Sequence, residues 1–180
     1  MKDIKLNGKT FRLSISEKEI LEKVKAVAEK INSDYEGKNP LFLSVLNGAF
    51  MFTSDLMKEI TLDCRISFVK LASYQGTMST GSVHEVIGVN ENLAGQDIII
   101  VEDIVESGKT MVQMIDSLSN RNPASVKICA LFHKPSKLQE PSIHVDYPAM
   151  VIPDDFIVGY GLDYDQRGRN LRDIYTIVEE

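Results

Sequence analysis

Two adjacent carboxylic acids and a turn of small residues stand close together in the middle of the chain. Glu102 and Asp103 follow an apolar run over 98–101, and a turn with two hydroxyl side chains and one glycine begins at Glu106 and ends at Thr110. Ionised carboxylates only accept hydrogen bonds, so the pair can hold hydroxyl groups or a divalent cation. Successive backbone N–H groups of a turn that opens a helix can point at one anion. The spacing therefore predicts a phosphate site beside two carboxylates.

The segments around this stretch are typical of an α/β protein. The β-branched run over 98–101 is typical of a strand covered on both faces in a parallel sheet. Behind the turn, Met111, Met114, Ile115 and Leu118 recur at helical spacing. Open α/β sheets bind their ligands at the carboxyl ends of their strands, where the two acids stand. The sequence thus predicts a mainly parallel, twisted sheet flanked by helices.

Two plainer interpretations compete with a phosphate site. Gly108, Lys109 and Thr110 could end a nucleotide-triphosphate P-loop, but that motif needs a glycine five residues before Gly108, where the chain has Asp103. The acids and the turn could also be an ordinary strand end followed by an ordinary turn. Their occurrence together in one complete loop argues against that coincidence.

Further helices and strands are predicted on both sides of this stretch. Ser16 and Glu19 form a capping box at the start of a helix. The helices are expected from Ser16 to near Ser33, from after Gly48 to about Lys58, and from the small-residue turn to about Asn120. The strands are expected over 41–46, 64–71, 83–89, 98–101, 126–132, 144–145, 150–152, 157–159 and 174–178. The polar, glycine-rich segment 73–81 is expected to be a mobile loop.

Composition and charge exclude several classes of protein. The 180 residues suit one domain, 1–180, and no repeat or linker divides them. With 26 acidic against 20 basic residues the net charge is -6, so neither nucleic-acid nor membrane binding is expected. No signal peptide is recognised at the N-terminus. Cys64 and Cys129 have no second Cys or His at ligand spacing, so reduced thiols and a cytoplasmic location are expected.

The stretch ending at Thr110 resembles the phosphoribosyl diphosphate (PRPP) signature of the type I phosphoribosyltransferases. The chain departs from that signature only at Glu106, where the family usually has Asp. Three more segments resemble motifs of the hypoxanthine-guanine phosphoribosyltransferases in the same order. They are the pyrophosphate loop at Val45–Phe52, the start of the mobile loop at Ser73 and Tyr74, and the purine-binding end at Phe156–Tyr164 with Arg169. The resemblance covers about 40–177 and implies that family's fold, with a small hood formed by both ends of the chain.

The resemblance implies a role in PRPP binding for most of these residues. Glu102 and Asp103 would hold the ribose hydroxyls and Mg²⁺. The residues that would hold the 5′-phosphate are Glu106, Ser107, Gly108, Lys109 and Thr110, with Lys109 contributing its side chain or only its backbone N–H. The residues that would bind pyrophosphate are Leu46, Asn47, Gly48 and Arg169, with backbone donors in the loop because Asn47 replaces a lysine common in relatives. Relatives often have a cis peptide bond in this loop, which the sequence alone does not reveal.

The resemblance also implies a purine site. Lys134 would donate to the exocyclic oxygen and so select 6-oxopurines over adenine, because a donor would meet the amino group of adenine. Phe156 would stack on the ring, with Ile104 beside it. The backbone carbonyls of Ile157 and Asp163 would read a 2-amino group, and Asp163 would also support Mg²⁺ through water.

Glu106 would occupy the place of the family's candidate general base, near purine N7. Such a base contributes about 10²- to 10⁴-fold when its geometry is right. Because glutamate is one methylene longer than aspartate, the alternative is that Glu106 only orients Lys134 or a water molecule. Both interpretations stay open on the sequence.

The activity that the resemblance implies is purine salvage. The phosphoribosyl group of PRPP would pass to hypoxanthine, guanine or both, giving IMP or GMP and pyrophosphate with Mg²⁺ present. The alternatives are a phosphoribosyltransferase for another base (xanthine, adenine or a pyrimidine) and a non-catalytic regulatory protein that keeps the fold. A homodimer or homotetramer is also expected from the resemblance.

Overall fold

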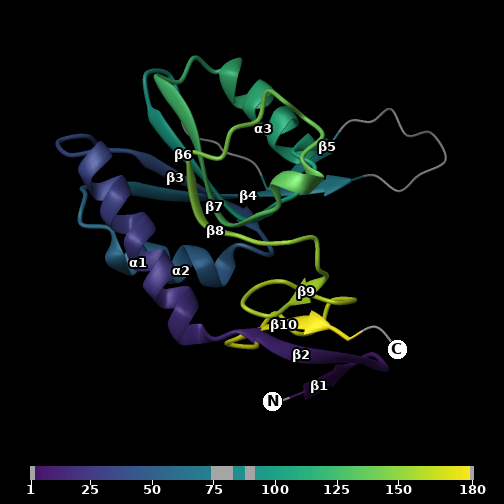
Figure 1. Cartoon of the computed structure of the whole chain (residues 1–180). Coiled ribbons are helices and arrows are strands. Elements are labelled where there is room, and N and C mark those ends of the chain that lie inside the picture. Colours follow the sequence, from purple (N-terminus) through teal and green to yellow (C-terminus); the bar gives the residue numbers. More distant parts are fainter. Residues whose placement is uncertain (1–2, 74–82, 88–91, 179–180) are drawn as a thin grey trace.

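The computed structural model of the chain describes residues 3–73, 83–87 and 92–178 (Figure 1). Within these residues the larger of two sheets has six strands. In spatial order they are β5 (Val83–Ile87), β4 (Arg65–Ser73), β3 (Leu41–Leu46), β6 (Asp97–Val105), β7 (Ser125–His133) and β8 (Tyr147–Val151). All neighbours in this sheet are parallel except β5 and β4. The expected mainly parallel sheet is confirmed.

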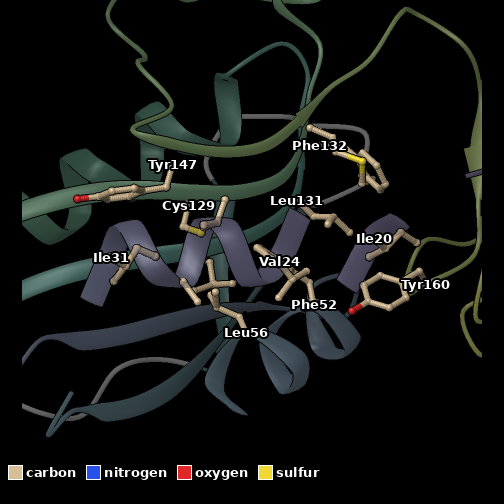
Figure 2. Close-up of a cluster of buried hydrophobic side chains, with 14 of the residues drawn as sticks. Ile20, Val24, Ile31, Phe52, Leu56, Cys129, Leu131, Phe132, Tyr147 and Tyr160 are labelled. Atoms are coloured by element: carbon tan, nitrogen blue, oxygen red, sulfur yellow. The ribbon is translucent and has the colours of Figure 1, made fainter. Parts of the chain in front are cut away.

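Helices cover both faces of this sheet. α1 (Glu17–Asp34) and α2 (Phe50–Glu59) lie on one face, and α3 (Lys109–Ser119) lies on the other (Figure 1). Figure 2 shows how α1 and α2 pack against each other and against β7, with side chains from all three elements meeting in one buried cluster. Its labelled members include Ile20, Val24, Ile31, Phe52, Leu56, Cys129 and Leu131. Because β3 and β6 are apolar on both faces, they form the centre of the sheet.

The two ends of the chain form a second, antiparallel sheet below the first (Figure 1). Its order is β1 (Asp3–Leu6), β2 (Lys9–Ile15), β10 (Ile174–Ile177) and β9 (Ile157–Val158). Phe11, Val158 and Tyr175 form its own small core. This sheet is the hood that was expected from the N-terminal and C-terminal segments.

The helix predictions agree with the structure to within one residue or so. The capping interaction is present, because the backbone N–H of Glu19 donates to the Ser16 hydroxyl over 3.3 Å. The strand expected over 144–145 is wrong: this segment is irregular and β8 begins only at Tyr147. Ile143 and Val145 are buried as anchors of a loop against the α3 face, which explains their apolar character.

The hairpin of β1 and β2 was not predicted, although Asn7–Gly8 between two short segments of alternating polar and apolar residues was an available signal. Ser73 ends β4, whereas Tyr74 and the rest of the expected mobile loop to residue 81 lie outside the described residues. A 3₁₀ turn, η1 (Pro135–Lys137), follows β7. No helix in the described part of the chain is long and apolar enough to cross a membrane.

Candidate active site

The two acids lie within β6 and not after it. The strand was expected to end at Val101, but it continues to Val105. β3 pairs with β6 only as far as Ser44 opposite Val101, whereas β7 remains paired to β6 up to Val105. The last residues of β6 therefore have a hydrogen-bonded neighbour on one side only, and Glu102 and Asp103 lie beside an open cleft.

This cleft, of about 380 Å³, is called the polar cleft below. It brings together the end of β3, the end of β6, the turn before α3 and part of the chain after β9. Its lining residues are Val45, Leu46, Gly48, Glu102, Asp103, Ile104, Val105, Glu106, Ser107, Gly108, Thr110, Met111, Asp163 and Arg169. Three separate stretches of the sequence thus meet in one place. Asn47 and Lys109 are not among the lining residues, and Val45, Val105 and Met111 were not anticipated.

The two acids of the polar cleft lie close together, and Glu102 is buried. Glu102 is only 8% exposed, and its Oε1 accepts a hydrogen bond from the Asp103 backbone N–H over 3.2 Å. Asp103 Oδ1 accepts from the Ile104 N–H over 2.9 Å. Within the described residues no Lys or Arg forms an ion pair with either acid. Burial, followed by the charge of Asp103, raises the pKa of Glu102 well above its ordinary value.

A hard divalent cation fits this pair. Mg²⁺ prefers oxygen ligands and is usually held by one or two carboxylates together with waters and substrate phosphates. Asp163, in contrast, is paired with Arg169, and no group of three or more acidic, His or Cys side chains suited to a metal occurs in the part of the chain that the structure describes. A magnesium ion at Glu102 and Asp103 would therefore need ligands from the substrate or water.

The loop after β3 approaches the acids through its glycine. A Cβ atom on Gly48 would lie only 1.6 Å from Asp103 Oδ2, so no larger residue fits without moving the carboxylate. The preceding peptide bond, between Leu46 and Asn47, is cis. Asn47 instead lines a neighbouring groove, together with Phe50. The loop thus presents its backbone, not a charged side chain, to the polar cleft.

The small-residue turn begins α3. Gly108 is the N-cap in the left-handed region, with φ of 83°, and the Lys109 backbone N–H donates to the Ser107 hydroxyl over 3.4 Å. A backbone hydrogen bond of 3.0 Å from Gln139 to the Ser107 carbonyl ties the turn to the segment after η1. The Lys109 side chain is exposed. The helix start therefore offers backbone donors to an anion in the cleft.

Arg169 lines the polar cleft and is held there by two partners. Its Nη2 forms an ion pair with Asp163 Oδ1 at 2.6 Å, and its Nη1 donates to the Gly161 carbonyl over 2.8 Å. Asp163 Oδ2 also accepts from the Gln166 N–H over 2.8 Å. The guanidinium is thus fixed in direction, and its planar fork suits phosphate binding.

A second cleft, of about 410 Å³, adjoins the first and is called the base cleft below. Its lining residues are Glu106, Ser107, Lys134, Lys137, Gln139, Asp154, Asp155 and Phe156. Lys134 is buried, and its Nζ donates to Glu106 Oε1 over 2.5 Å and to the Asp155 carbonyl over 2.8 Å. Because Glu106 and Ser107 line both clefts, a ligand in each would meet at this turn.

The predicted purine residues are only partly gathered in the base cleft. Phe156 lines it and is half exposed, with its ring 6.4 Å from that of Phe11 and 5.8 Å from that of Tyr164. The side chain of Ile157 is buried in the core and lines neither cleft, and Ile104 and Asp163 line the polar cleft. Sequence reasoning missed Lys137, Gln139, Asp154 and Asp155. In the sequence they look like surface residues, and the one available signal was that they lie close in the sequence to Lys134 or Phe156.

The fold and the two clefts define an α/β protein whose polar cleft, at the carboxyl edge of a parallel sheet, is suited to a phosphorylated ligand. The model of the phosphoribosyl transferase domain family matches residues 14–165, so the chain belongs to this family. A hypoxanthine-guanine phosphoribosyltransferase of Streptococcus thermophilus is 38% identical over 180 residues, which cover 99% of this chain and 96% of that protein. One from Streptococcus pyogenes is 40% identical over 170 residues, or 94% of each chain.

Solved structures agree with these sequence relatives. A hypoxanthine-guanine phosphoribosyltransferase of Bacillus anthracis has a TM-score of 0.86 and 37% identity, with 92% of this chain and 98% of that chain covered. A hypoxanthine phosphoribosyltransferase of Staphylococcus aureus has a TM-score of 0.87 and 35% identity, with coverage of 93% and 91%. The chain also matches the bifunctional protein TilS/HprT of Listeria innocua, 40% identical over 161 residues, but it spans only 25% of the length of that relative.

Proposed function

We propose that this chain is a purine-salvage enzyme that transfers the phosphoribosyl group of PRPP to hypoxanthine, guanine or both. The products are IMP or GMP and pyrophosphate. The observation that carries the proposal is the meeting of the polar cleft and the base cleft at Glu106 and Ser107. One cleft has the acids and helix start suited to a sugar phosphate, and the other has a buried cation suited to a 6-oxo group. The names of the relatives support the same activity.

In the polar cleft, the sugar carbon becomes cation-like as pyrophosphate leaves. Glu102 and Asp103 bind the ribose hydroxyls, and their charge favours the developing cation. The turn that includes Ser107 and Thr110 binds the 5′-phosphate through its N–H groups. Mg²⁺, when bound at the two acids, would neutralise charge on the departing pyrophosphate. Backbone donors of the loop at Gly48 and the guanidinium of Arg169 bind the pyrophosphate itself.

In the base cleft, Lys134 donates to the exocyclic oxygen of the purine and Phe156 stacks on the ring. The carbonyls of Ile157 and Asp163 accept from a 2-amino group. Glu106 either takes the proton from purine N7 or orients Lys134. The short contact between Glu106 and Lys134 supports the orienting role in the absence of ligand, and the base role requires the Glu106 carboxylate to accept from purine N7 as well.

The test is a turnover assay of the purified chain with PRPP, Mg²⁺ and each of hypoxanthine, guanine, xanthine, adenine and uracil. Nucleotide and pyrophosphate should form with hypoxanthine, guanine or both. Turnover with adenine or uracil alone would instead identify an enzyme for another base. PRPP binding without turnover of any base would indicate a non-catalytic regulatory protein.

Assembly and location are proposed from the family resemblance alone. They are a homodimer or homotetramer in the cytoplasm. Sedimentation of the purified chain at several concentrations would show whether it assembles, and a monomer at all of them would contradict the first of these proposals.

A further inference from the structure

Four charged side chains of alternating sign follow one another along the base cleft. Lys134 Nζ lies 2.5 Å from Glu106 Oε1 on one side and 3.9 Å from Asp154 Oδ1 on the other. Asp154 Oδ2 in turn lies 2.7 Å from Lys137 Nζ. Asp154 is thus shared between two lysines, and Lys134 lies between two carboxylates.

These four side chains differ sharply in exposure. The side chain of Lys134 is 5% exposed, whereas those of Glu106, Asp154 and Lys137 are 48%, 46% and 49% exposed. Water can solvate the charges of the three exposed side chains. Lys134 needs fixed partners, because a buried cation that loses its counter-ion is strongly destabilised.

Glu106 cannot remain the full counter-ion of Lys134 if it is the general base of the proposed reaction. If Glu106 accepts a hydrogen bond or a proton from purine N7, its contact with Lys134 is weakened or its charge is cancelled. The Asp155 carbonyl still accepts from Lys134, but it is neutral. Within the described residues, the remaining carboxylate within 4 Å of Lys134 Nζ is then that of Asp154.

We propose that Asp154 is a positioning residue, a second counter-ion that holds Lys134 in place once Glu106 turns to the purine. Lys137 fixes the Asp154 carboxylate by binding one oxygen, so that the other faces Lys134. The inference rests on the proposed function, and it concerns base binding, not PRPP binding.

The effect of Asp154→Asn on the full chain should depend on whether Glu106 is intact. It should be larger with Glu106 intact for analogue binding, and larger in the Glu106→Gln background for thermal stability. The probe is an inert hypoxanthine analogue that keeps N7–H and has carbon in place of the attacking ring nitrogen. Its binding is measured by calorimetry with PRPP and Mg²⁺ present. With Glu106 intact, Asp154→Asn should weaken binding about threefold, because Asp154 is needed mainly after the ligand has engaged Glu106. In the Glu106→Gln background the same change should alter binding less than about 1.5-fold, because Lys134 then depends on Asp154 with and without ligand.

Thermal unfolding of the free protein should show the reverse. Asp154→Asn alone should lower the midpoint by about 1 °C, and in the Glu106→Gln background by about 3 °C, since Lys134 then has neither carboxylate. PRPP affinity should stay within about 1.5-fold, Asp154→Glu should restore most analogue binding, and Asp116→Asn on the exposed face of α3 is the matched control.

Equal effects of Asp154→Asn in both backgrounds would overturn the positioning role. A loss of PRPP affinity as large as the loss of analogue binding would also overturn it. In either case, turnover by the wild type would still support the proposed function. A wild-type chain that neither binds the analogue nor turns over any base would overturn both.

Discussion

Gly161 packs directly onto the carbonyl group of Gly48. A Cβ atom on Gly161 would lie 2.0 Å from Gly48 O, and Gly161 itself has a φ of 100°. Its N–H donates to the Arg169 carbonyl over 2.9 Å, and its own carbonyl accepts from the Arg169 guanidinium. One glycine therefore connects the loop after β3 with the arginine that lines the polar cleft.

Gly161→Ala should reduce both stability and pyrophosphate-side binding. The methyl group meets a backbone oxygen that cannot rotate away, and the positive φ adds strain, so a loss of roughly 2–4 kcal/mol is expected in urea unfolding. Gly95→Ala is the matched control, because Gly95 has a φ of 72° but nothing lies within 4 Å of the place that a methyl group would occupy. It should cost only about 1–2 kcal/mol. Equal losses in the two variants would mean that the contact with Gly48 is unimportant.

The acids of β6 should be needed for turnover and not for folding. Glu102→Gln combined with Asp103→Asn keeps the shape of both side chains and removes their charge. Turnover with PRPP and hypoxanthine should fall by at least about 10²-fold, because the ribose contacts and the charge complementary to the sugar cation are lost. Circular dichroism should show an unchanged fold. Glu36→Gln with Asp116→Asn makes the same change at exposed positions, and near-normal activity of the first pair would refute the site assignment.

Local patterns were enough to predict the helices, because caps and periodic apolar residues are contained within each segment. The extent of β6 was not predictable in this way. Its last residues are polar, and they remain in the strand because β7 continues to pair with them after β3 has stopped. The strand predicted over 144–145 is absent because buried apolar residues, here Ile143 and Val145, can anchor a loop as well as a strand.

The polar cleft was largely predictable, because its motifs occupy short stretches with distinctive residue types. The base cleft was not. Lys137 and Asp154 belong to segments that look solvated, and their importance depends on a distance across the fold to Lys134. Charge pairs between distant segments leave no local pattern in a single sequence.

Tyr160 should make stability depend on alkaline pH. Its buried hydroxyl donates to Asp55 Oδ2 over 2.5 Å, and burial, followed by Asp55, raises the pKa of Tyr160 above its ordinary value. The folded chain therefore keeps a proton that the unfolded chain releases near pH 10. The stabilising contribution is complete below pH 10 and is lost as the pH rises further, by about 1.4 kcal/mol per pH unit.

Tyr160→Phe removes this dependence. In urea unfolding, wild type should exceed the variant at pH 8, and the gap should narrow above pH 10. Asp55 retains Lys58 as an ion-pair partner at 2.7 Å in both proteins, so the comparison isolates the hydroxyl. A gap of constant size from pH 8 to pH 10.5 would show that Tyr160 ionises equally in both states.

Lys134 should matter for the base and not for PRPP. Lys134→Met keeps the buried aliphatic stem and removes the ammonium, so the apparent KM for hypoxanthine should rise about tenfold or more, while that for PRPP changes less than about threefold. Steady-state kinetics with each substrate varied separately gives both values. Lys109→Met is the control, since that exposed side chain lines neither cleft. A loss confined to PRPP would mean that the base cleft has been misplaced.

Substitutions at Glu106 should show whether it is the general base or only orients Lys134. Glu106→Gln removes the proton acceptor but keeps the length of the side chain. If Glu106 is the general base, turnover should fall by about 10²- to 10⁴-fold and the acidic limb of the pH-rate profile should flatten.

Glu106→Asp keeps a carboxylate near N7 but shortens the reach toward Lys134. In the wild type, Lys134 Nζ donates to Glu106 Oε1 over 2.5 Å. This variant should therefore keep substantial turnover and the wild-type pH profile, with any loss appearing in the KM for hypoxanthine. Wild-type turnover and an unchanged pH profile in the Gln variant would show that the carboxylate does not take the proton. In that case, an increase of the KM for hypoxanthine in both Glu106→Gln and Glu106→Asp would indicate that Glu106 orients Lys134.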